Sequence, residues 1–128
     1  MSADLAHADD WPRFRKGIWQ FERTLSYNGS NVKAANRVLF KQEMQRCVDP
    51  SEAMRETFRP VSVGNCHSTR AERVANKYVF ALRCDYMGPV RTTIDVESET
   101  AYIEINEVQV GQNPRTDTVI ARRIAGCD

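Results

Sequence analysis

The residues of this chain that could do chemistry are first of all its four cysteines, at positions 47, 66, 84 and 127. Their spacing contains no C-x-x-C pair, and only His7 and His67 could complete a metal shell. Because a structural zinc site usually takes its ligands in close pairs, we expect no metal and no cofactor. Two disulfides account for the cysteines better, and they leave no free thiol to act as a nucleophile.

The pairing of these cysteines follows from a predicted hairpin. Cys66 and Cys84 are equidistant from Ala75, which lies in the polar break at 74–77. If the chain folds back there, the two cysteines face each other at a Cα separation of about 4.5–5.5 Å, within the range of a disulfide. Cys47 and Cys127 are then left to each other. Disulfides indicate an oxidising compartment, so we expect a periplasmic or secreted protein.

Other catalytic patterns are missing from the sequence. It contains no GxSxG, phosphate-binding loop, Rossmann glycine pattern or HExxH motif. We interpret His67 as a surface histidine, on the face opposite Cys66. Carboxylate pairs such as Glu97 with Glu99 alternate on strands or lie in a turn, as solubilising side chains do. We therefore do not expect an enzyme.

Net charge and hydropathy limit the classes of partner that the protein could bind. The 18 basic and 17 acidic residues give a net charge of +1, which provides no strong field for nucleic acid or a charged membrane surface. No apolar run approaches the ~20 residues that span a bilayer, so we expect a soluble domain without a transmembrane segment. The remaining partners are a small ligand or another envelope protein.

The elements that must position these residues are mostly strands. Period-two alternation predicts strands at 17–26, 37–47, 90–97, 101–110 and 116–125, beside the two strands of the hairpin at 66–84. In the strand at 101–110, Ala101, Ile103 and Ile105 alternate with Tyr102, Glu104 and Asn106, and in the strand at 116–125 one face carries Ile120, Arg122 and Ile124. We expect the isoleucines to point inward.

A short helix is predicted near 50–58. Asp49 has the position of an N-cap, Pro50 that of the first helical residue, and Glu52 completes a capping box. Met54 and Phe58 are four residues apart and share one face. We interpret this pair as a lid on the core, which could also face a ligand.

The predicted fold is therefore all-β and mainly antiparallel. About seven strands form a meander that curls into a lipocalin/calycin-like barrel or half-barrel, or folds over as a sandwich, to hide its edges. We divide the chain into a flexible segment at 1–12 and a single disulfide-bonded β domain at 13–128. Ala6-His7-Ala8 has the form of a cleavage site, so we expect a mature exported chain, or one with an added Met1.

Two resemblances refine this picture. Gly17-Ile18-Trp19, with Arg122 or Arg123 in the last strand, resembles the lipocalin-like barrels, in which an arginine of the final strand covers the tryptophan of a Gly-x-Trp motif. We assign that role to Arg122, because it shares a face with Ile120 and Ile124.

The second resemblance covers about residues 13–128. It rests on Lys16-Gly17-Ile18-Trp19, on Cys47-Val48-Asp49-Pro50-Ser51-Glu52, on Cys66 and Cys84, and on the closing Arg122-Arg123-Ile124-Ala125-Gly126-Cys127. These landmarks are similar to those of the bacterial family catalogued as domain of unknown function 3617 (DUF3617). This chain departs from the family in having Ile18 for a leucine, Asp49 for a threonine, and a different ending. The resemblance implies periplasmic residence and two disulfides, and it carries over no catalytic or binding residue.

Two function classes remain. The first is a non-catalytic binding protein of the bacterial envelope, whose cup-shaped sheet holds a small apolar or amphipathic ligand beneath the Met54/Phe58 helix. The second is a structural or protein-interaction module whose barrel is filled by its own side chains. A cavity of at least ~300 Å³ would favour the first class, and a solid core the second.

Overall fold

The computed structural model describes residues 11–27, 37–58, 62–63, 66–68, 72–84, 87–110 and 113–127, and it contains strands and one helix in these ranges. The strands are β1 (Gly17–Tyr27), β2 (Arg37–Val48), β3 (Ser62–Val63), β4 (Cys66–Ser68), β5 (Glu72–Val74), β6 (Lys77–Cys84), β7 (Met87–Ser98), β8 (Ala101–Val110) and β9 (Asn113–Ala125). The helix is α1 (Pro50–Phe58). The all-β class with one short helix at the predicted position is confirmed.

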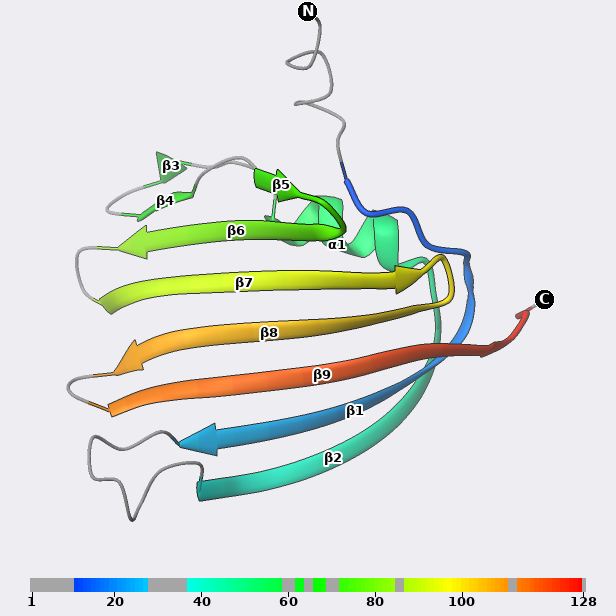
Figure 1. Ribbon diagram of the computed structural model, residues 1–128, viewed down its shortest axis with the longest axis horizontal. Coiled ribbons are helices and arrows are strands. Elements are labelled where there is room, and N and C mark those ends of the chain that lie inside the picture. The colour runs from blue at the N-terminus through cyan, green and yellow to red at the C-terminus, as the bar shows by residue number, and fades with distance from the viewer. Residues whose placement is uncertain are drawn as a thin grey trace, which may run out of the picture.

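The strands form one antiparallel sheet, which is strongly curved (Figure 1). Eight of them make a hydrogen-bonded path in the order β2-β1-β9-β8-β7-β6-β4-β3, and β5 pairs with β6 beside it. Strands β6 to β9 form a meander, as expected, and β9 then pairs with β1. The first and last long strands of the chain therefore lie side by side.

Of the predicted alternatives, the closed barrel is not formed, because the sheet stays open in the described part of the chain. In the described part of the chain the path ends at β2 on one side and at β3 on the other. Closure would require these two edges to pair, but β2 has 12 residues and β3 has 2. A strand of two residues offers too few backbone hydrogen bonds to close a barrel against β2.

The predicted hairpin between Cys66 and Cys84 is present with one difference. Cys66 pairs with Cys84, as expected, but the first strand is divided into β4 and β5, and the register shifts by one between them. Ala75 lies in the two-residue turn before β6 and has a positive φ of 57°. Hairpin turns of two residues require such a conformation, which explains where the chain reverses.

Helix α1 lies over one end of the concave face of the sheet (Figure 1). Its first turn is capped as predicted, because the Asp49 Oδ1 accepts a hydrogen bond from the Glu52 amide at 3.3 Å. The preceding segment is tied to the same turn, since the Phe14 amide donates to Ser51 Oγ at 2.7 Å. The helix and residues 11–16 therefore cover the same end of the sheet.

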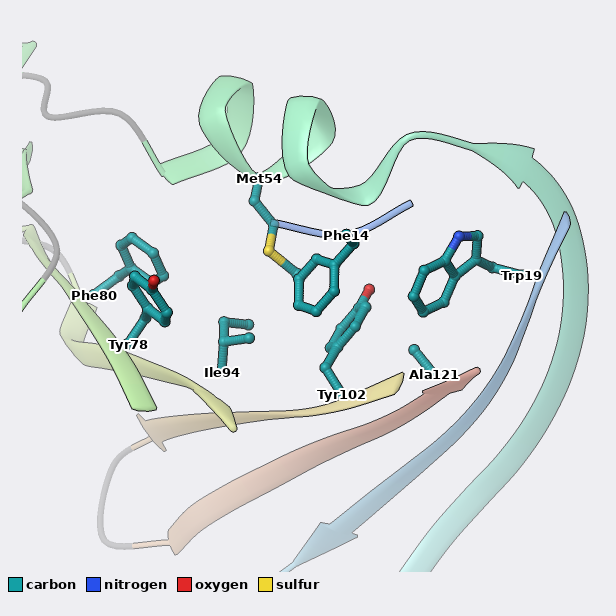
Figure 2. Packing of buried hydrophobic residues seen from close by; sticks show 8 residues of the cluster. All are labelled: Phe14, Trp19, Met54, Tyr78, Phe80, Ile94, Tyr102 and Ala121. Atoms are coloured by element: carbon teal, nitrogen blue, oxygen red, sulfur yellow. The ribbon is translucent and has the colours of Figure 1, made fainter. Parts of the chain in front are cut away.

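The core is an aromatic cluster between α1 and the sheet (Figure 2). Its buried members are Phe14, Trp19, Met54, Tyr78, Phe80, Ile94, Tyr102 and Ala121. The rings of Phe14 and Tyr102 are 4.6 Å apart at their centroids, and those of Trp19 and Tyr102 are 5.5 Å apart. The helix thus covers a solid core, and the expected cup beneath it is filled.

The N-terminal boundary differs from the expectation at two residues. Residues 1–10 lie outside the described part of the chain, but Trp11 and Pro12 belong to the packed domain. Pro12 is fully buried, and the Trp11 ring stacks on Phe80 with centroids 5.5 Å apart. The packed domain therefore includes Trp11 and Pro12.

In β8 and β9, the face that points into the core is the one that we expected to point outward. In β8 the buried residue is Tyr102, and in β9 it is Ala121, whereas Ile120 is 43% exposed and Ile124 is 47% exposed. The strand register explains the inversion, because Ala121 pairs with both Phe21 and Tyr102. A small residue at 121 leaves room for the neighbouring aromatic rings, which an isoleucine would fill.

Candidate functional site

The concave face has a second half that α1 does not cover. An open cavity of about 320 Å³ lies there, over the inner faces of β2, β1, β9 and β8. Its lining residues are Phe21, Arg23, Gln42, Met44, Arg46, Glu104, Asn106, Asp117 and Val119. Each strand contributes residues that are two positions apart, as expected for side chains on one face of a sheet. This cavity is the candidate binding site.

The polar wall of the cavity contains an ion pair between the first and last long strands. Arg23 Nε contacts both carboxylate oxygens of Asp117 at 2.9 Å, and Arg23 Nη2 donates to Oδ2 at 2.6 Å. Asp117 is the more enclosed partner, with 17% of its side chain exposed against 44% for Arg23. The hydrogen bond with Asp117 raises the pKa of Arg23, and burial opposes that rise. The pair thus holds the guanidinium charged and in a fixed orientation.

A second polar group consists of Thr92, Asn106 and Glu104. Thr92, which is buried, donates to Asn106 Oδ1 at 2.6 Å, and Asn106 Nδ2 donates to Glu104 Oε2 at 2.9 Å. The threonine therefore fixes the amide, and the amide fixes the carboxyl group. This chain of hydrogen bonds directs Glu104 from the sheet into the cavity wall.

The Glu104 carboxyl is electrostatically unusual. Burial raises the pKa of Glu104, the hydrogen bond from Asn106 lowers it, the Asp117 charge raises it further, and the Arg23 charge lowers it. Glu104 in turn adds to the rise that burial produces in the pKa of Tyr102. Among the described residues, no basic side chain forms an ion pair with Glu104. Its negative charge is therefore poorly compensated by the protein.

The arrangement is chemically suited to binding. Phe21, Met44 and Val119 supply apolar surface, and the polar wall supplies hydrogen-bond donors and acceptors. The lining side chains that the structure describes include no serine, cysteine or histidine. Within the described ranges, no group of three or more His, Cys, Asp or Glu side chains is placed to hold a metal ion.

Comparison with known proteins identifies the family. The model of the family described as "Protein of unknown function (DUF3617)" matches residues 14–127, which include Trp19 and all four cysteines. The chain belongs to this family. The resemblance noted in the sequence is thus confirmed. No curated protein and no solved structure matches the chain.

None of the helices in the described part of the chain has the length and hydrophobicity that crossing a membrane requires.

The described lining residues of the cavity include no cysteine. Cys47, at the end of β2, forms a disulfide with Cys127, which follows β9, and their Cα atoms are 5.9 Å apart. This bridge passes β1, the strand that separates β2 from β9. Cys66 is also in a disulfide and lies opposite Cys84 in the register. The side chain of Cys84 is outside the described residues, so the Cys66–Cys84 bond stays a prediction.

Arg122, the predicted arginine partner of Trp19, does not lie opposite it in the strand register. Arg122 pairs with Gln20 and is exposed, whereas Arg123 pairs with Trp19 and is half-buried. Arg123 Nε donates to the Lys16 carbonyl at 2.9 Å, and the indole of Trp19 donates to the Arg15 carbonyl at 2.9 Å. A register shift between positions 18 and 19 accompanies this change of face.

The same corner explains the glycine of the Gly-x-Trp motif. A Cβ at Gly17 would overlap the Ala125 carbonyl oxygen and the guanidinium group of Arg123. Gly17 therefore allows the arginine to cross the start of β1, and this corner has a structural role.

The predicted lid residues do not line the candidate site. Met54 is buried in the aromatic core, and Phe58 stacks on Phe80 with centroids 4.4 Å apart. Phe58 also lines a cavity of about 80 Å³ at the edge of the core. That volume is well below the ~300 Å³ of typical ligand pockets.

Sequence reasoning missed the polar residues of the candidate site. Arg23 and Asp117 are 94 positions apart, and only strand pairing brings them together. Glu104 and Asn106 were assigned to the outer face, together with Tyr102. One available signal was the tyrosine itself, because a large aromatic residue that alternates with two polar ones is unusual on a solvated face.

Proposed function

We propose that the protein is a non-catalytic, periplasmic envelope protein that binds a small amphipathic ligand on the uncovered half of its concave face. The single observation that carries this proposal is the division of that face into two halves. The half beneath α1 is filled by aromatic side chains, and the other half holds the open cavity of about 320 Å³. This volume lies at the lower end of the range of volumes of pockets that bind small molecules.

The lining of the cavity supports the amphipathic character of the ligand. Phe21, Met44 and Val119 would contact the apolar part of the ligand, and the Met44 side chain is 37% exposed. The Arg23–Asp117 pair and the Glu104 carboxyl would contact a polar part. A ligand with both parts would satisfy the two kinds of surface together.

The disulfides support the proposed location. Cys47 and Cys127 are bonded to each other, and Cys66 is in a second disulfide. Such bonds form and persist in the periplasm or outside the cell and are rare in a reducing cytosol.

A structural or protein-interaction role is the second candidate. It is favoured by the solid core beneath α1 and by Ile120 and Ile124, which are exposed on the outer face of β9. The same experiment separates the two candidates.

That experiment is native mass spectrometry of the protein purified from its own periplasm. We expect a reproducible added mass on the wild-type protein, because a filled cavity would retain its ligand. Val119→Trp should remove that mass by filling the cavity. Ile120→Trp, the neighbouring position on the opposite face, is the matched control and should retain it. Wild-type protein without added mass would favour the interaction role.

A further inference from the structure

Among the described residues, the Glu104 carboxyl of the cavity has no ion-pair partner. Two arginines and two carboxylates line it, so its formal charges balance. However, Arg23 and Asp117 are joined by three short contacts and neutralise each other. Arg46 and Glu104 remain, on strands separated by β1 and β9. The charges that a ligand meets are thus a single cation and a single carboxyl group at opposite sides of the cavity.

These two remaining charges differ in their surroundings. Arg46 is exposed on the edge strand β2, where water solvates its guanidinium. Glu104 is half-buried on the inner strand β8 and is held by the hydrogen bond from Asn106. A charge that is removed from water gains more from a partner than an exposed one does, because the local dielectric constant is lower. Glu104 is therefore the stronger determinant of what binds.

The carboxyl group is also oriented before any ligand arrives. Thr92 donates to the Asn106 amide oxygen, and the Asn106 amide nitrogen in turn donates to Oε2, one of the two Glu104 carboxylate oxygens. A positioned acceptor loses little conformational entropy on binding. The nearby ring of Phe21 adds a surface that attracts cations through its π electrons.

We propose, on the basis of the function proposed above, that the ligand is an amphipathic amine whose ammonium group pairs with the Glu104 carboxylate. Its apolar part lies along Phe21, Met44 and Val119, the apolar side chains of the cavity. The ammonium group donates to the carboxylate and supplies the missing positive charge. Arg46, at the far side, disfavours a second positive group on the same ligand.

The test compares three probes with the same alkyl chain and different head groups. They are n-octylamine, n-octanol and n-octanoate, titrated into the full chain at neutral pH and followed by calorimetry. An alkylamine is protonated there, because its pKa is close to the ~10.4 of lysine. We expect n-octylamine to bind about tenfold more tightly than n-octanol, the gain typical of one charge-assisted hydrogen bond.

Two variants assign the preference to one side chain. Glu104→Gln retains an acceptor for Asn106 and should abolish the preference for the amine. Lys41→Gln removes an exposed charge of β2 that does not line the cavity, and it should preserve the preference. Circular dichroism of both variants checks that the sheet is intact.

The outcomes separate this inference from the proposed function. Equal binding of the three probes, tighter binding of n-octanoate, or an amine preference that survives Glu104→Gln would overturn the inference and leave the cavity as a binding site. Failure of all three probes to bind at millimolar concentration would overturn both.

Discussion

The disulfide between Cys47 and Cys127 gives the most quantitative prediction. It closes a loop with a sequence separation of 80 residues and joins the end of edge strand β2 to the C-terminal end of β9. Cys47 is exposed and Cys127 is half-buried, so replacing both with alanine creates no large cavity. The double variant Cys47→Ala/Cys127→Ala therefore removes little except the covalent link.

The expected loss follows from the length of the loop. Cross-linking lowers the entropy of the unfolded chain by about 2.1 + 1.5R ln n cal/mol/K, where n is the number of residues in the loop. For the separation of 80 this is about 15 cal/mol/K, or about 4.5 kcal/mol at 25 °C. The loop between Cys66 and Cys84 has ~18 residues, so the same relation gives about 3.2 kcal/mol for their predicted bond.

Urea unfolding measures both losses. The fluorescence of the buried Trp19 reports the transition, and linear extrapolation gives the free energy of unfolding in water. We expect Cys47→Ala/Cys127→Ala to lose about 1.3 kcal/mol more than Cys66→Ala/Cys84→Ala, since only the loop lengths differ in the relation. The reasoning is refuted if removing the disulfide of the shorter loop lowers the free energy of unfolding more than removing that of the longer loop. It is also refuted if the loss for the longer loop is less than about 1 kcal/mol.

Three further predictions concern the inner face and its corner. Gly17→Ala should lower the free energy of unfolding by about 1–3 kcal/mol, because the added Cβ meets the Arg123 guanidinium. An unfolding midpoint in urea equal to that of the wild type would contradict this. Ala121→Leu should destabilise the protein by a similar amount, because it overpacks a buried site. Ile120→Leu, on the exposed face of the same strand, is the control and should change the midpoint of thermal unfolding little. Equal thermal midpoints for these two variants would show that the faces of β9 are assigned wrongly. Because the pKa of Glu104 is raised in the folded protein, its protonated form stabilises the fold at acidic pH, and this contribution is lost as the pH rises through the raised pKa. Glu104→Gln should therefore gain stability relative to the wild type as the pH rises above about 4, the ordinary pKa of a glutamate, and parallel pH profiles of the two proteins would contradict the shift.

The helix shows how far local signals reach. The cap at Asp49, the proline at the first helical position and the spacing of Met54 and Phe58 predict α1 within its observed bounds, Pro50–Phe58. Each of these signals depends on residues within a few positions of one another. Such signals can be interpreted from the sequence because the physical interactions behind them are equally local.

The facing of β8 and β9 shows where local signals end. Both strands alternate apolar residues with others, so either face could have been the inner one. The decision rests on Tyr102, whose ring packs against Phe14 and Trp19 from the first part of the chain. Ala121 is small enough to lie beneath these rings, as Figure 2 shows. Contacts between segments this far apart outweigh the burial of an isoleucine.

By itself, then, the sequence determined the all-β class, the family, the helix, most strand positions and the pairing of Cys66 with Cys84 in the register. The family rests on short motifs distributed along the chain, and the other features depend on neighbours in the chain or on short spacings. The tertiary structure alone decided that the sheet stays open, which side of β8 and β9 faces inward, and that Arg23 meets Asp117 beside Glu104. These features depend on pairing across the whole sheet, since the candidate site is assembled from four strands that join the two ends of the domain.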